Sequence, residues 1–286
     1  MIKKGMIFTF LKVSFLLFIC AITLYPFLHM IAVSFSANLP VMQGKVGLIP
    51  IGFNISAYKE VFQNKMLFTA YKNTIIYVVG RTLIGLLVTS CGAYALTKKH
   101  MLFHRFFSLM VVFTMFFSGG MIPTYLVMQK LNLIDTRWGV ILINCVSVWY
   151  LLLMRTFFSS IPKDLEDSGK IDGLQDIGIL WYIILPLSKA AIATIGLFYA
   201  VAMWNSFFNP FIYLNSPEKY PLQVILRQIV IANDMKAIEY AGEDAAAMPE
   251  SIKYATIMVS TIPIILVYPF IQKYFVKGVM IGSVKG

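Results

Sequence analysis

The sequence contains uncharged blocks long enough to cross a lipid bilayer. No Asp, Glu, Lys or Arg occurs from Val13 to Val33, and none occurs from Phe106 to Gln129. A membrane-spanning helix needs about 20 mostly apolar residues. These blocks lack the period-two alternation of a membrane β-barrel strand, and a helix satisfies its own backbone hydrogen bonds inside lipid. The chain is therefore predicted to be an all-α integral membrane protein.

The composition agrees with this prediction. Of the 286 residues, 59% are hydrophobic and 13% are charged, whereas an ordinary soluble domain carries about 25% charged residues. A soluble protein of this composition would have too little polar surface to cover its core. The first apolar run follows Lys3 and Lys4 and exceeds the roughly 7–15 residues of a cleavable signal peptide, so we expect it to remain as the first span.

Six transmembrane helices are expected in a single domain covering residues 1–286. Their predicted ranges are about 7–33, 73–96, 106–129, 138–157, 183–214 and 254–272.

Both termini are predicted to lie in the cytoplasm, because Lys and Arg concentrate in the short loops on the side of the termini. These basic residues are Lys3, Lys4, Lys98, Lys99, Arg105, Arg155, Lys163, Lys170, Lys273, Lys277 and Lys285. The opposite loops, roughly 34–72 and 215–253, also carry lysines. There the lysines are spread over longer segments that contain acids, and long segments count less in this rule.

Several other classes of protein are disfavoured. The net charge of +11 comes from basic residues set between apolar blocks rather than from a nucleic-acid-binding stripe. Cys20, Cys91 and Cys145 lie singly in apolar blocks, which argues against a disulfide framework or a zinc site. His100 and His104 are four residues apart, but no neighbouring acid completes a metal site.

One predicted cytoplasmic segment, residues 162–186, differs in character from the rest of the chain. Five of the thirteen acids fall between Asp164 and Asp176. Pro162 suits a helix start, acids in the first turn complement the helix dipole, and Gly173 suits a helix stop. The pattern predicts a short amphipathic helix, a turn, and a second helix whose Pro186 bends the entry to the fifth span.

The spacing in this segment resembles the coupling motif of binding-protein-dependent ABC importer permeases. That motif reads EAA, two residues, Asp-Gly, nine residues, then I-x-L-P. Asp167-Ser168-Gly169 takes the EAA place, Asp172-Gly173 takes the Asp-Gly place, and Ile183, Leu185 and Pro186 complete the pattern without a gap. The departures are Asp for Glu and Ser-Gly for Ala-Ala. The resemblance implies the six-helix fold of type I ABC importer permeases.

The resemblance also implies a mechanism, in which the short helix docks on a cytoplasmic ATPase and relays its closure to the membrane helices. Asp167 or Glu166 would pair with basic groups on the ATPase, Ser168 and Gly169 would allow close approach, and Gly173 would permit the turn. A solvated loop that only caps two helices is the alternative. The implied partners are a second permease, an ABC ATPase dimer, an extracytoplasmic sugar-binding protein or lipoprotein, and membrane lipids.

No GxxxxGK[ST] sequence occurs in the chain. Phosphate binding by a P-loop needs that spacing. ATP and Mg²⁺ are therefore expected on the partner ATPase, and no cofactor is expected in this chain.

Further stretches narrow the resemblance to carbohydrate permeases. The residues 277–286 are similar to the tail of maltose-type permeases. The stretches 116–125, 133–138 and 204–209 resemble the LplC/YtcP-like branch, which is associated with oligosaccharides derived from complex polysaccharides or glycans.

A sugar pathway is predicted along the fifth span, because sugars bind aromatic faces together with amide and hydroxyl groups. The candidate residues are Trp204, Asn205, Ser206, Phe208 and Asn209. Asn205 and Asn209 would share a face if the helix is continuous. Hydrogen bonding to a neighbouring helix is the alternative role for these polar groups. Arg81, inside the second span, is expected to reach the surface or to pair with a partner subunit rather than to contact substrate.

Other functions remain as alternatives. A permease for another polar solute would share these features. An ion-coupled secondary transporter would need inverted repeats and intramembrane acids, and a membrane enzyme would need a nucleophile–base or metal constellation within the spans. We find none of these features in the sequence.

Overall fold

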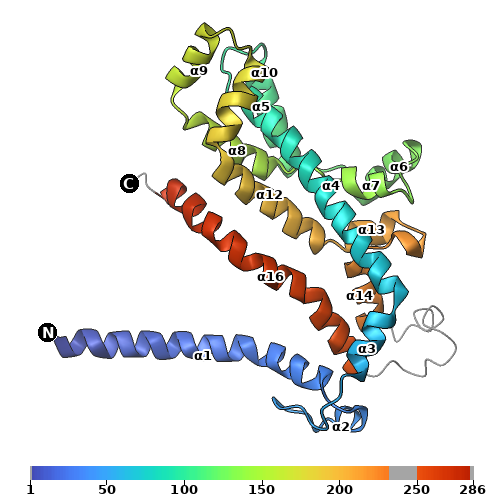
Figure 1. The fold of residues 1–286 in the computed structure, drawn as a ribbon. Helices are drawn as coiled ribbons and strands as arrows, with labels where there is room; N and C mark the ends of the chain where they lie inside the picture. Colours follow the sequence, from blue (N-terminus) through green and yellow to red (C-terminus); the bar gives the residue numbers. More distant parts are fainter. Residues whose placement is uncertain (1, 232–249, 284–286) are drawn as a thin grey trace. The chain divides into compact units, whose positions relative to one another are not determined.

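The computed structural model describes residues 2–231 and 250–283, and these residues contain helices and no strand (Figure 1). In chain order the helices are α1 (Ile2–Ser34), α2 (Asn38–Met42), α3 (Ser56–Gln63), α4 (Lys65–Ala95), α5 (His104–Phe116), α6 (Met121–Lys130), α7 (Arg137–Leu142), α8 (Val148–Ser159), α9 (Lys163–Ile171), α10 (Asp176–Ile179), the π-helix Leu180–Ile184, α11 (Leu185–Leu187), α12 (Lys189–Trp204), α13 (Phe208–Tyr213), the 3-10 helix Pro217–Lys219, α14 (Leu222–Ile231) and α16 (Glu250–Ser283). The chain divides into two units, residues 1–68 with 225–263 and residues 69–224 with 264–286.

In the first unit, the end of α1 packs against the segment that follows it. Ala32 and Val33 form a small core with Val41 and Val46. The imidazole of His29 lies 2.9 Å from the carbonyl oxygen of Gly47. The chain after α1 is thereby folded back onto the helix end rather than left extended.

Among the residues that the structure describes, no side chains cover the rest of α1. Every side chain from Phe8 to Leu28 is exposed, although the helix is apolar enough to cross a membrane. An apolar surface of this size is stable only against lipid or another protein.

The core of the second unit joins α4, α8 and α12. Tyr94 near the end of α4 packs with Met154 of α8 and with Ile195 and Tyr199 of α12. Gly85 of α4 lets the backbone of the link between α7 and α8 come close, since a Cβ on Gly85 would lie 2.7 Å from the carbonyl oxygen of Cys145. Close approach through small residues is typical of helix packing in membranes.

Three of the six predicted spans are interrupted, which differs from the expectation of continuous helices. The range 106–129 is split into α5 and α6, which meet at 114°. The range 138–157 is split into α7 and α8, and the range 183–214 contains both α12 and α13. Among the described residues, the single helices long and apolar enough to cross a membrane are Phe8–Ser34 and Lys65–Ala95, and two bent helix pairs also pass this test when each pair is taken as one span.

Two of these three breaks coincide with a residue of positive φ. Between α5 and α6, Gly120 adopts a φ of 87°, which residues with a Cβ rarely take. Between α7 and α8, Asn144 adopts a φ of 51°, a left-handed conformation that Asn tolerates better than most residues. The apolar residues continue through these turns without interruption. For this reason the hydrophobic pattern alone predicted unbroken spans.

Parts of two predictions lie outside the described residues. Residues 232–249, with Lys236 and the acids Glu239, Glu243 and Asp244 of the predicted outer loop, are among them. Lys285, one of the predicted cytoplasmic charges, is another.

Gly139 tests the packing at the start of α7. A Cβ at this position would lie 2.1 Å from the carbonyl oxygen of Leu133. We expect Gly139→Ala to lower the stability of the detergent-purified protein by on the order of 1–3 kcal/mol, the usual cost of overpacking. Gly47→Ala is the control, because no atom lies within 4 Å of its added Cβ. Equal melting temperatures for the two variants would contradict this account.

Candidate functional site

The predicted short helix is present as α9. It begins after Pro162, carries Asp164 and Glu166 in its first turn, and has Lys170 in its last turn. This charge order complements the helix dipole. The local prediction from the sequence is confirmed here.

The end of α9 depends on Gly173. This residue has a φ of 83°, its amide donates to the carbonyl of Lys170 at 3.0 Å, and the amide of Leu174 donates to the carbonyl of Gly169 at 2.9 Å. The two bonds form a Schellman motif, which normally takes Gly at this position. Gly173 therefore stops the helix as predicted.

Gly169 faces its own chain, which differs from the predicted contact with a partner. The residue is buried, and an added Cβ would lie 2.6 Å from the Cδ1 atom of Ile183 and 3.5 Å from the Cγ1 atom of Ile179. The small residue lets α9 lie directly against the helical segment that follows it. The spacing of the motif placed a small residue here but did not show which surface it meets.

Glu166 is also engaged within the chain, so the expectation that it pairs with a partner is not supported. Its carboxylate accepts a hydrogen bond from the ammonium group of Lys98, which follows α4. The two side chains are 18% and 11% exposed. Burial alone would lower the pKa of Lys98, but the hydrogen bond with Glu166 and the neighbouring Tyr94 outweigh burial and raise it.

The opposite side of α9 remains open. Asp167, Ser168 and Asp172 are exposed. The Asp167 carboxylate has a weak contact with Lys170 at 3.4 Å, and the Ser168 hydroxyl donates to the carbonyl of Asp164. Among the predicted coupling acids, Asp167 and Asp172 are thus the ones directed to the surroundings.

Exposed apolar side chains occur at the end of α9 and in the helical segment that follows it. Ile171 is 87% exposed, Ile177 is 73% exposed and Tyr182 is 75% exposed. Apolar groups next to exposed acids are typical of a surface that another protein covers.

Pro186 lies in the predicted bend. Pro186 is the middle residue of α11, which follows the π-helix Leu180–Ile184, and the helical segment Asp176–Leu187 meets α12 at 86°. Proline has no amide hydrogen to continue the helical ladder into the preceding turn. The helix nevertheless continues through Leu187, and the bend lies at Ser188, whose amide still donates to the carbonyl of Ile184 at 3.0 Å. The predicted bend at the entry to this span is confirmed.

The predicted sugar-contact residues lie at a helix break rather than on one helix face. Trp204 is the last residue of α12, Asn205 caps its end, and Asn209 belongs to α13. The Asn205 side-chain amide donates to the carbonyl of Val201 at 3.0 Å. The shared face of Asn205 and Asn209 is therefore wrong, because the helix does not continue between them.

Of these residues, Trp204 has the surroundings that best suit a contact with a sugar. Its ring lies 6.4 Å from that of Tyr71. Its Nε1 atom is buried and has no hydrogen-bond partner among the described residues. Ser206 and Asn209 are partly buried, and Phe208 is 53% exposed.

Arg81 acts within the chain. Its guanidinium donates to the carbonyl oxygen of Asn144 at 2.6 Å and lies 3.5 Å from the sulfur of Met203. Asn144 is in the break between α7 and α8, so the arginine bonds a carbonyl that no helix satisfies. The predicted alternatives, the surface or a partner, do not describe this contact.

A polar cluster around Asp135 fixes the chain after α13 and was not predicted as a site. The carboxylate accepts bonds from the amides of Asn215 and Ser216 at 3.0 Å and from the Lys219 ammonium at 2.8 Å. Burial opposes ionisation, but these bonds outweigh it and hold the pKa of Asp135 well below its usual range. The stretch 133–138 was noted from the sequence only as a family resemblance, because these partners lie about 80 residues away.

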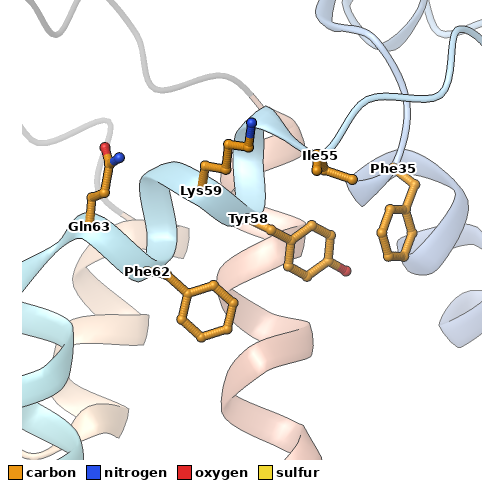
Figure 2. Close-up of a pocket in the computed structure, with 6 residues that line it drawn as sticks. All are labelled: Phe35, Ile55, Tyr58, Lys59, Phe62 and Gln63. Atoms are coloured by element: carbon orange, nitrogen blue, oxygen red, sulfur yellow. The ribbon is translucent and has the colours of Figure 1, made fainter.

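The first unit carries a shallow pocket along α3 (Figure 2). Phe35 stacks on Tyr58 with ring centroids 4.7 Å apart, and Phe62 continues the apolar surface. Lys59 and Gln63 line it as well. Aromatic residues with a neighbouring lysine are typical of the membrane–water interface.

Comparison with known proteins identifies the family. Residues 101–281 match the model of the family described as "Binding-protein-dependent transport system inner membrane component".

Two curated relatives from Bacillus subtilis match nearly the whole chain. Protein LplC is 43% identical over 99% of this chain and 97% of its own length. The polygalacturonan/rhamnogalacturonan transport system permease protein YtcP is 42% identical over 99% of this chain and 100% of its own length.

A solved structure has a similar fold. It is a chain of a bacterial ABC transporter involved in the import of the acidic polysaccharide alginate, with a TM-score of 0.88 and 36% identity. The match covers 95% of this chain and 98% of that chain.

The Asp135 cluster leads to a pH prediction. Because the folded-state pKa is lowered, the contribution of the carboxylate to stability is fully present above about pH 4 and is lost as the pH falls further. We expect Asp135→Asn to lower the melting temperature at pH 7 by roughly 2 °C or more, and the difference from the unchanged protein to shrink below pH 4. Glu60→Gln, an exposed acid on α3, is the control. A difference that stays constant with pH would contradict the assignment.

Proposed function

The chain belongs to the family of binding-protein-dependent transport system inner membrane components, and on this premise we propose that it forms part of the pathway by which an ATP-driven importer brings an oligosaccharide into the cytoplasm. It is a permease subunit and not an enzyme. The observation that carries the proposal is the open face of α9 in a chain of this family. That face combines exposed acids with exposed apolar groups.

The proposed partner at this face is a cytoplasmic ATPase. Asp167 and Asp172 can pair with basic groups there, and Ile171 can enter an apolar depression. Charge complementarity guides such docking, and buried apolar groups add affinity. ATP and Mg²⁺ belong to the ATPase, which supplies the energy for the movement.

The proposed topology follows from the basic loops and the apolar helices. Six passes, some of them bent, would place both termini and α9 in the cytoplasm. A second permease would complete the pathway, and an extracytoplasmic sugar-binding protein would deliver the cargo. The uncovered apolar side chains of α1, from Phe8 to Leu28, are suited to lipid and to that second permease.

In this proposal, transport proceeds by alternating access. Closure of the ATPase dimer would move α9, and the membrane helices would then switch between outward and inward openings. Only a ligand or nucleotide state that binds one conformation more tightly can shift such an equilibrium.

The proposed cargo is an oligosaccharide derived from a polysaccharide. The names of two relatives support this class, one for polygalacturonan/rhamnogalacturonan transport and one for arabinooligosaccharides. The solved relative imports alginate, an acidic polysaccharide. The buried Nε1 atom of Trp204 has no hydrogen-bond partner within the described part of the chain, and the residue offers an aromatic face and a donor that suit a sugar.

Reversing the charge of Asp167 tests the docking face. We expect Asp167→Lys to reduce the amount of ATPase that co-purifies with the permease by at least about tenfold, because like charges at an interface cost several kcal/mol. Glu60→Lys, at an exposed position on α3, is the control. Unchanged recovery of the ATPase with Asp167→Lys would exclude this face as the docking surface.

Removing the proposed sugar contacts tests the pathway. The double variant Trp204→Ala, Asn205→Ala should raise the sugar concentration for half-maximal uptake by roughly tenfold, the scale of one stacking contact and one hydrogen bond. Uptake of labelled galacturonide and arabinose oligosaccharides into proteoliposomes would measure this change and compare the two cargo types. Val79→Ala, an exposed apolar position of α4, is the control. Uptake kinetics unchanged for both sugars would remove these residues from the pathway.

A further inference from the structure

Lys98 lies on a short continuation of α4. The amide of Leu96 donates to the carbonyl of Gly92, and the amide of Lys98 donates to the carbonyl of Ala95. The same turn then holds Met101, whose amide donates to the carbonyl of Lys98. Backbone hydrogen bonds therefore hold Lys98 in place at the end of α4.

The ammonium group of Lys98 is held from three directions. It pairs with the carboxylate of Glu166 on α9 and lies 3.9 Å from the carboxylate of Asp176 on α10. It also lies 4.3 Å from the centroid of the Tyr94 ring, which itself belongs to the buried core. The cation thus joins the end of α4 to the helices on both sides of the turn at Gly173.

This ion pair differs in burial from the other pair on α9. Lys98 and Glu166 are 11% and 18% exposed, whereas Lys170 and Asp167 are 48% and 65% exposed. Exposed pairs of charges contribute little, because water and salt screen them. Separating a shielded ion pair leaves each charge without its counter-charge, which is costly. The Lys98–Glu166 pair is therefore the one able to transmit a displacement of α9.

Two contacts therefore hold α9, and they lead to different parts of the fold. Through Gly169, α9 packs on Ile179 and Ile183, which precede α12. Through Glu166, α9 is bonded to Lys98 at the end of α4. The apolar contact at Gly169 thus leads to α12 and the ionic contact at Glu166 leads to α4, and these two helices share one core.

We propose that Lys98 is a positioning residue that fastens the coupling helix α9 to α4, so that displacement of α9 by the ATPase reaches α4 as well as α12. This inference rests on the proposed function, since it takes the ATPase as the source of the displacement. Lys98 touches neither the sugar nor the ATPase in this role. It acts through Glu166.

The consequence is a separation of docking from coupling. The docking face, with Asp167 and Ile171, is on the open side of α9, and Lys98 contacts the opposite side. Loss of the ion pair should leave ATPase binding intact and reduce the movement that each ATP cycle delivers to α4.

Charge reversal tests the inference in the assembled importer reconstituted in proteoliposomes. We expect Lys98→Glu and Glu166→Lys each to retain the ATPase but to import at least about threefold less sugar per ATP hydrolysed, the scale of coupling between contacting residues. The combined variant, with both reversals, should recover to within about twofold because the pair is restored in the opposite sense. Lys99→Glu is the matched control, since Lys99 is the next residue and is exposed.

A neutral double variant keeps the test decisive if the single reversals fail to fold. Replacing both partners by apolar side chains of similar shape is nearly neutral for stability, so Lys98→Met with Glu166→Met should remain folded yet lose the link. The expected result is a normal melting temperature with the same threefold loss in sugar imported per ATP.

The outcomes separate this inference from the proposed function. Normal coupling in the neutral double variant, or no recovery in the folded double reversal, would overturn the role of Lys98 while the importer still works. Failure of the unchanged permease to retain any ATPase would instead overturn the proposed function itself.

Discussion

Every backbone amide and carbonyl inside the bilayer has to find its partner within protein, because lipid offers neither donor nor acceptor. The broken helices of this chain meet that constraint through side chains of their neighbours. Arg81 bonds the free carbonyl of Asn144. The hydroxyl of Tyr199 accepts from the amide of Ser147 and pairs with Thr89. The interruptions between helices are therefore bonded parts of the fold.

Most of these bonds lead to α4. Asn73, near its start, donates to the carbonyls of Glu218 and Tyr220, and Tyr77 donates to that of Lys219. Further along α4, Arg81 donates to the carbonyl of Asn144 and Thr89 is hydrogen-bonded to the hydroxyl of Tyr199. The long helix α4 thus supplies most of the side chains that bond the links between the broken helices of that unit.

The proposed mechanism uses the same support. In this account the ATPase meets the open face of α9, and the closed face of α9 is bonded to α4 through Lys98 and packed toward α12 through Gly169. A single short helix would then act on both walls of the shared core. The outer face of α9 is acidic and partly apolar, and its inner face is buried. Because the two faces are separate, α9 can bind the ATPase on one side and move the membrane helices from the other.

The membrane class, the short helix at 163–171 with its stop at Gly173, and the bend near Pro186 could all be predicted from the sequence. Each depends on properties of neighbouring residues: hydrophobic length, helix capping and a missing amide hydrogen. The partners of Arg81 and Asp135 and the inward direction of Glu166 and Gly169 were decided by the tertiary structure. These features depend on groups far away in the chain, as Glu166 is 68 residues from Lys98, and no local pattern records which distant surface a side chain will meet.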